Sequence, residues 1–90
     1  MYHVHIRITL RPSILDPQGK AVRHALHALD LPSIADVRTG KHVELVVDTD
    51  DAEQAHAVAV EAAEKLLANP VTEDFTILSV LTPADLSAVE

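Results

Sequence analysis

Apolar and polar positions alternate strictly over residues 3–11, which is the pattern of a half-buried β-strand. The apolar face of this predicted strand carries Val4, Ile6, Ile8 and Leu10. Two shorter strands are predicted at Ile34–Arg38 and Val43–Asp48, joined by a tight turn at residues 39–41. Gly40 would supply the positive φ that such a turn needs. A last strand is predicted at Asp74–Val80.

Apolar residues recur at helical spacing in the two segments between these strands. Asp16 and Pro17 are typical of a helix N-cap and a first helical residue, and Pro32 closes that segment. In the second segment, Asp50 and Glu53 have the spacing of a capping box. The residues Asn69-Pro70 favour a helix end, because Asn tolerates the left-handed conformation and Pro cannot continue a helix. The apolar stripes are Val22, Ala25, Leu26 and Leu29 in the first helix, and Ala55, Ala59, Ala62 and Leu66 in the second.

The element order is therefore β-α-β-β-α-β, the ferredoxin-like or split-βαβ arrangement of the α+β class. We expect two helices to cover one face of a four-stranded antiparallel sheet. The chain shows no repeat, linker or low-complexity segment, so residues 1–81 are predicted to form a single domain. Residues 82–90 are predicted to be a C-terminal tail with one helical turn.

Charge is distributed unevenly along this acidic chain, which has 90 residues and a net charge of −7. Residues 1–41 have a balance of +3, whereas residues 42–90 have a balance of −10. Such asymmetry suggests complementary surfaces between subunits and argues against nucleic-acid binding, which needs a dense cationic footprint. So short a chain builds only a small core, so oligomerisation would help it.

The residue types needed for catalysis or metal binding are sparse. Cysteine is absent, so a disulfide, a thiolate zinc site and a thiol nucleophile are excluded. His3 with His5, and His24 with His27, could each supply two metal ligands, but surface or interface histidines are the favoured interpretation. With two glycines the chain has neither a dinucleotide-binding fingerprint nor a Walker loop. We predict no catalytic, cofactor or metal site in this chain.

Several functions use the ferredoxin-like topology. An RNA-recognition domain would need aromatic residues on its central strands, and a metallochaperone would need a CxxC motif; both are missing. An acylphosphatase would need an anion-binding loop after the first strand, where Asp16 would repel an anion. A small-molecule regulatory domain of the ACT type remains an alternative. The apolar runs are too short to span a bilayer and the N-terminus lacks a signal peptide, so a cytoplasmic location is expected.

Three motifs in order resemble the PurS family, the small subunit of phosphoribosylformylglycinamidine synthase. They are Leu15–Ala21 (LDPQGKA), Asp36–Lys41 (DVRTGK), and Lys65–Val71 (KLLANPV) followed by Glu73–Phe75 (EDF). The resemblance extends from about Val4 to Val80. It implies a noncatalytic subunit that bridges a large synthase subunit (PurL) and a glutaminase subunit (PurQ) and supports ammonia transfer between them. It also implies that ATP and magnesium are used by the complex rather than bound by this chain, and that the chain forms a homodimer or homotetramer.

The motifs nominate candidate partner-interface residues: Asp16, Pro17, Gly19, Arg38, Gly40, Lys41, Asn69 and Pro70. The last predicted strand indicates an interface between copies of the chain. If Phe75 and Ile77 face the core, strict alternation turns Leu78 and Val80 outward, onto the same face as Val46. A bulge that turns Leu78 and Val80 inward is the alternative.

Overall fold

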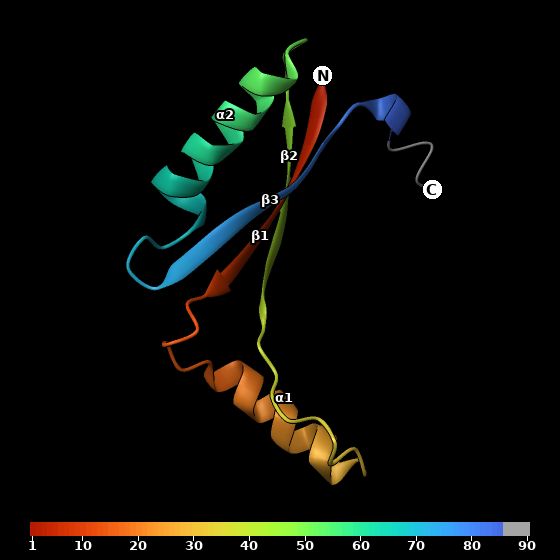
Figure 1. Ribbon diagram of the computed structural model, residues 1–90, viewed down its shortest axis with the longest axis vertical. Helices are drawn as coiled ribbons and strands as arrows, with labels where there is room; N and C mark the ends of the chain where they lie inside the picture. The colour runs from red at the N-terminus through yellow and green to blue at the C-terminus, as the bar shows by residue number, and fades with distance from the viewer. Residues whose placement is uncertain (86–90) are drawn as a thin grey trace.

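In the computed structural model, which describes residues 1–85, three strands form an antiparallel sheet in the order β2-β1-β3 (Figure 1). β1 (Tyr2–Leu10) is central, and β2 (Gly40–Val47) and β3 (Glu73–Leu81) flank it. β1 pairs antiparallel with both neighbours, as expected for an antiparallel sheet. The predicted tail begins with a helical turn at residues 83–85; residues 86–90 lie outside the described residues.

Three cross-strand rows build the core, each centred on a fully buried residue of β1. Val4 lies between Leu45 and Val80, Ile6 between Val43 and Ile77, and Ile8 between Lys41 and Phe75. Full burial of one such aliphatic side chain contributes roughly 1.5–3 kcal/mol. The alternation predicted from residues 3–11 is therefore confirmed as the centre of the fold.

β3 contains a β-bulge, so the strict alternation expected for this strand is wrong. Ile77 lies opposite Ile6 and Ser79 lies opposite His5, so Leu78 is the extra residue. The bulge rotates Val80 toward the core, where it packs beside Val4, and leaves Leu78 outward with 47% of its surface exposed. Strict alternation would have buried Ser79 instead, and burying a hydroxyl without a hydrogen bond costs free energy. The bulge avoids this by burying Val80.

Helix α2 (Ala52–Ala62) covers the core face of the sheet and continues as a π-helical turn, η1 (Ala63–Leu67). Ala55, Ala59 and Ala63 are fully buried, so small side chains let the helix approach β1 closely. The N-cap is Asp51, which accepts from the Glu53 N–H at 3.0 Å, so the predicted cap at Asp50 is wrong by one residue. The helix ends before Asn69, as expected.

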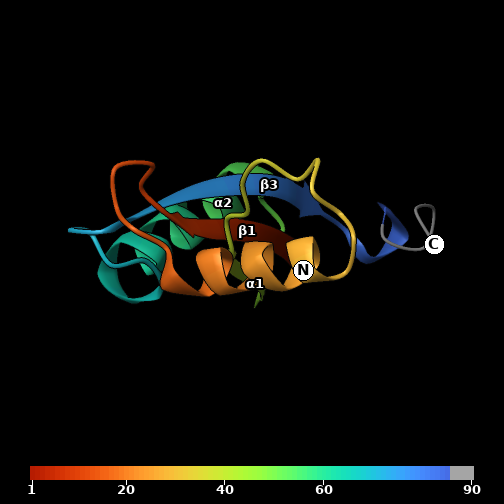
Figure 2. The same cartoon turned by 90° about the horizontal axis from the view of Figure 1, so that it is seen from below.

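Helix α1 (Pro17–Ala28) does not cover the sheet, contrary to expectation. It projects from the end of β1 and lies beside the extended segment of residues 31–39, so the molecule is a crescent (Figure 1). Seen along its length the molecule is thin (Figure 2), with extents of 49 × 34 × 13 Å. Its radius of gyration is 16.5 Å, against about 12 Å for a compact chain of this length. The apolar side of α1 is left open: Leu29 is 70% exposed.

The strand expected at residues 34–38 and the tight turn expected at residues 39–41 do not form in the described residues, so both predictions are wrong. Residues 34–38 pair with no strand, and Gly40 is the first residue of β2 rather than the corner of a hairpin. No glycine of residues 1–85 has positive φ. Gly40 instead permits close packing, since a Cβ there would lie 2.6 Å from the Ile8 carbonyl oxygen. Residues 34–38 therefore continue into β2 without a hairpin turn.

Asp30 takes the left-handed conformation at the end of α1, with φ of 65°. The Leu31 N–H donates to the Leu26 carbonyl and the Asp30 N–H to the His27 carbonyl, which closes the helix with a Schellman motif. Asn69 was expected to use this conformation at the end of α2 but does not. Its side chain makes a turn instead, accepting from the Val71 N–H at 3.0 Å.

Within residues 1–85, no helix is long and apolar enough to cross a bilayer.

Candidate functional site

The buried carboxylate of Asp16 joins the first two sequence motifs. Asp16 is the N-cap of α1 and accepts from the Gly19 N–H at 3.0 Å. The same carboxylate accepts from the Thr39 N–H at 2.7 Å and from the Thr39 hydroxyl at 3.0 Å. Only 4% of the residue is exposed. Asp16 therefore ties the start of α1 to the residue that precedes β2.

These donors stabilise the charged form of the carboxylate. The pKa of Asp16 is lowered, first by the backbone N–H of Thr39 and then by that of Gly19, while burial opposes the shift. The Thr39 hydroxyl and the positive charge of Arg38 lower it further. The carboxylate is thus held ionised as a structural anchor, with its oxygens already occupied by protein donors.

Gly19 and Gly40 are required by close contacts on either side of this anchor. A Cβ on Gly19 would lie 2.3 Å from the Val37 carbonyl oxygen and 2.7 Å from the Asp16 carboxylate. Neither contact leaves room for a side chain. Gly19 thus lets the first turn of α1 meet residues 37–39, just as Gly40 lets β2 begin against β1.

Arg38 fastens the connection between β1 and α1 from the other side. Its guanidinium Nη2 donates to the carbonyl oxygens of Arg11 at 2.9 Å and Ile14 at 3.0 Å, with a longer contact of 3.4 Å to that of Leu10. A planar guanidinium holds several carbonyl acceptors in fixed directions. Arg38 therefore fixes the path of residues 10–14 before α1 begins.

Lys41 brings the third motif to the same end of the sheet. Its ammonium lies 3.6 Å from Glu73 Oε1 and donates to the Leu67 carbonyl at 3.3 Å. The same Glu73 oxygen accepts from the Asn69 N–H at 2.8 Å. The three motifs, separate in sequence, thus meet where β1 ends and where β2 and β3 begin. We call this meeting point the motif junction, formed by residues 10–19, 36–41 and 67–74.

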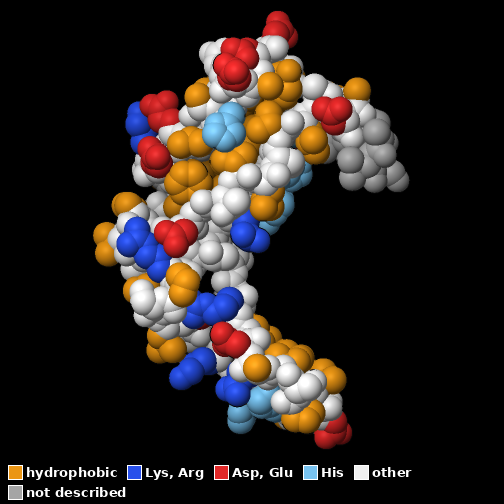
Figure 3. Space-filling model, in the orientation of Figure 1, with side chains coloured by type: hydrophobic (Ala, Val, Ile, Leu, Met, Phe, Trp, Pro, Cys, Tyr) orange, Lys and Arg blue, Asp and Glu red, His pale blue; other side chains and the backbone are white. Residues whose placement is uncertain are grey.

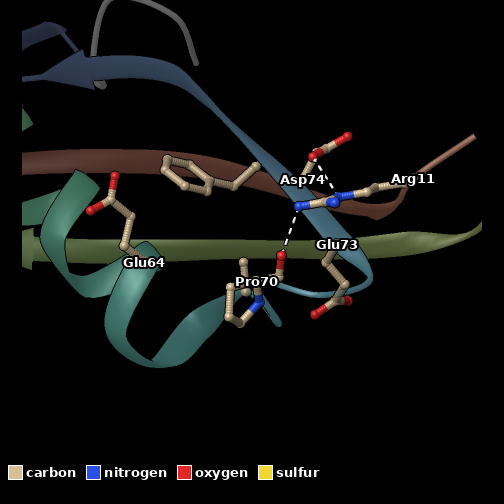
Figure 4. A pocket seen from close by; sticks show the side chains of 7 residues that line it. Arg11, Glu64, Pro70, Glu73 and Asp74 are labelled. Carbon is tan, nitrogen blue, oxygen red and sulfur yellow. Dashed lines mark hydrogen bonds and ion pairs between the residues drawn. The ribbon is translucent and has the colours of Figure 1, made fainter.

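Of the open hollows that flank the motif junction, two are lined by Glu73. One, of about 330 Å³, is lined by residues of all three motifs, including Pro17, Gln18 and Glu73. The other, of about 390 Å³, lies between the end of η1 and β3. In it the Arg11 guanidinium donates to the Pro70 carbonyl at 2.7 Å and lies 3.3 Å from Asp74 (Figure 4). Arg11 thus fastens the turn at Asn69-Pro70 to the sheet.

The eight candidate partner-interface residues are therefore brought together at one end of the sheet, where β1 ends and β2 and β3 begin, in the middle of the crescent (Figure 1). Asp16, Gly19, Arg38 and Gly40 each have a structural role there. Thr39, Arg11 and Glu73 complete the junction but were not among the candidates. Thr39 lies inside the second motif, between the candidates Arg38 and Gly40. This position could have identified it as a candidate from the sequence. Arg11 and Glu73 depend on contacts between distant segments that spacing does not reveal.

Four of the histidines in residues 1–85, namely His3, His5, His27 and His42, make local hydrogen bonds. His3 Nδ1 and Glu44 Oε1 are 3.0 Å apart, and this hydrogen bond is the main cause of the lowered pKa of Glu44. His5 Nδ1 lies 3.0 Å from His42 Nε2, and His27 Nε2 lies 2.8 Å from the Ile34 carbonyl oxygen. Within residues 1–85, no group of three or more His, Asp or Glu side chains is arranged to hold a metal ion.

Comparison with known proteins identifies the family. The family model described as PurS, phosphoribosylformylglycinamidine (FGAM) synthase, matches residues 3–80. The chain belongs to the PurS family. A phosphoribosylformylglycinamidine synthase subunit PurS from Mycobacterium leprae is 49% identical over 74 residues, covering 80% of this chain and 87% of the relative.

Solved structures of the PurS family share this fold. The Bacillus subtilis PurS structure in its C2 crystal form superposes with a TM-score of 0.79 at 43% identity, covering 91% of this chain and 100% of that one. A chain in the structure of PurLQS from Thermotoga maritima superposes with a TM-score of 0.80 at 28% identity, covering 89% and 96%. The resemblance inferred from the three motifs is confirmed, and the ACT-type alternative is not favoured.

The Asp16 anchor predicts a pH-dependent stability. Unfolded Asp has a pKa of about 3.9, and the folded value lies lower, so the carboxylate stabilises the fold fully above about pH 4. That contribution is lost as the pH falls through the lower folded pKa. Asp16→Asn should therefore be less stable than the parent chain at pH 7, and the difference should shrink below about pH 4.

Denaturant unfolding from pH 7 to pH 2.5 measures this difference. Asp48→Asn is the matched control, because Asp48 is exposed at the opposite end of β2. A difference for Asp16→Asn that stays constant across this pH range would contradict the anchoring role.

Proposed function

We propose that this chain is the small, noncatalytic subunit of a multi-subunit phosphoribosylformylglycinamidine synthase. In this role it bridges the large synthase subunit (PurL) and the glutaminase subunit (PurQ) and supports ammonia transfer during the ATP- and glutamine-dependent amidation of formylglycinamide ribonucleotide. The observation that carries the proposal is the match of nearly the whole chain to PurS, together with its likeness to a chain of the PurLQS structure.

The chemistry of the chain supports a structural role in this complex. It has no cysteine for a glutaminase nucleophile, and at the motif junction Asp16 is held by Thr39 and Lys41 is paired with Glu73. We assign ATP and magnesium to the partner subunits. Since ATP and glutamine are cytoplasmic metabolites, a cytoplasmic location belongs to the same proposal.

The crescent shape supports an assembly with a second copy of the chain. In a four-stranded ferredoxin-like sheet, residues 34–38 would pair with the outer edge of β2, which has no partner strand here. They cannot turn back onto it, because Asp16 holds Thr39 against α1. Residues 34–38 of a second copy can fill that edge, and the same exchange would place its α1 beside α2. We propose a homodimer completed in this way.

The open face of the sheet offers a second surface for association. Val46 is 53% exposed and Leu78 is 47% exposed on this face, whereas Val80 has turned to the core. Exposed apolar residues grouped on one sheet face favour a covered surface. Stacking of two dimers through Val46 and Leu78 would give the homotetramer.

Reconstitution tests the subunit role. PurL and PurQ from the same organism, supplied with glutamine, ATP, magnesium and formylglycinamide ribonucleotide, should form product only when this chain is added. The chain alone should form none, because it lacks a nucleophile and a phosphate-binding loop. Full glutamine-dependent activity of PurL and PurQ without the chain would contradict the proposal.

Sedimentation tests the assembly of copies. The parent chain should sediment as a dimer or tetramer at micromolar concentration. Leu29→Lys should dissociate it, since Leu29 is 70% exposed on the apolar side of α1 and its loss costs the single chain little. Val71→Lys, at a 74% exposed position in the turn before β3, is the matched control and should leave assembly unchanged. A monomeric parent chain, or dissociation by Val71→Lys alone, would contradict the exchange.

A further inference from the structure

A cationic hollow lies on the open side of the sheet, at the inner edge of the crescent. It has a volume of about 300 Å³ and lies where β1, β2 and the bulge of β3 come together. Its lining includes Arg7, Arg38, His42 and Thr9 and contains no acidic residue. This is unusual in a chain with twice as many acidic as basic residues. Lys and Arg side chains are visible at the inner edge of the crescent in Figure 3.

The two arginines keep their charges in different ways. Arg38 donates to carbonyl oxygens, which orient its guanidinium without neutralising it. Arg7 lies opposite His42 on one side and Thr76 on the other, so its side chain is on the face away from α2. Within residues 1–85, Arg7 has no hydrogen bond or ion pair. Two guanidinium groups from different segments therefore border one hollow with no carboxylate bound to either.

The neighbouring acidic side chains are already engaged. Glu44, next to His42 on the same face, is hydrogen-bonded to His3. Asp74 is paired with Arg11. Asp36 borders an adjacent hollow and accepts from the Val37 N–H at 2.9 Å. Lys41, the third cation of the lining, is paired with Glu73, and the charge of Arg38 acts on Asp16. Within residues 1–85, Arg7 is thus the cation of the hollow that has no acidic partner.

We propose that this hollow binds the phosphate group of a small phosphate monoester. Its volume is at the lower end of the range for small-molecule sites, which suits one compact anionic group. A phosphate carries about −1.5 to −2 charges and three acceptor oxygens, so it can meet two guanidinium groups and a further donor at once. A carboxylate offers two oxygens in one plane.

The test is a titration of the full ¹⁵N-labelled chain, followed by NMR at constant ionic strength and pH 7.5, with phosphate, acetate and ribose 5-phosphate. The amide signals of Gly40 and His42 should shift saturably with phosphate in the millimolar range. Ribose 5-phosphate should bind at least as tightly, and acetate at least tenfold more weakly. Because the titration uses the chain alone, its outcome is independent of the proposed subunit role.

Arg7→Gln should weaken phosphate binding at least tenfold, whereas Arg23→Gln, at an exposed position on α1, should leave it unchanged. Arg7 makes no internal bond among the described residues, so its replacement spares the fold. Absence of saturable shifts, or equal binding by Arg7→Gln, would overturn the proposal. Acetate binding as tightly as phosphate would overturn it in favour of a carboxylate. A phosphoserine peptide binding while ribose 5-phosphate does not would overturn the small-molecule assignment.

Discussion

The hydrogen bonds between Asp16 and Thr39 are the constraint on which the shape of the molecule depends. They join two residues that lie 23 positions apart and fix the start of α1 to the approach to β2. Gly19 lets the two segments touch, and Arg38 fixes the path from β1 into α1. Residues 10–40 therefore form an arm of defined direction. That arm leads away from the sheet and exposes the side of α1 that a ferredoxin-like fold would bury.

Local rules predicted the elements well where neighbouring residues decide the outcome. The alternation of residues 3–11 predicted β1, and Asp16 with Pro17 predicted the start of α1, because a strand face and a helix cap depend on the residues beside them. Gly40 shows the limit. A glycine after a short apolar run is typical of a turn, but this one is needed because a Cβ there would lie 2.6 Å from the Ile8 carbonyl oxygen. Spacing alone does not distinguish these two uses.

The bulge at Leu78 and the direction of α1 depend on contacts between distant segments. The bulge follows from the need to place Val80 rather than Ser79 beside Val4. The candidate site was predictable as three motifs, because each is a short run of residues typical of one family. Their convergence was not, since Lys41 reaches Glu73 and Arg11 reaches Pro70 only in the folded chain. The expected fourth strand does not form within residues 1–85, because its segment, residues 34–38, is held along α1.

The central claim is that the fold of one copy is completed by residues 34–38 of another. A mixed dimer of ¹³C-labelled and unlabelled chains tests it most directly, because isotope-filtered NMR detects contacts between copies only. The account predicts contacts between Ile34 or Val37 of one copy and the 43–47 segment of the other. Contacts of residues 34–38 that arise only within one chain, in a sample shown to be dimeric, would contradict it.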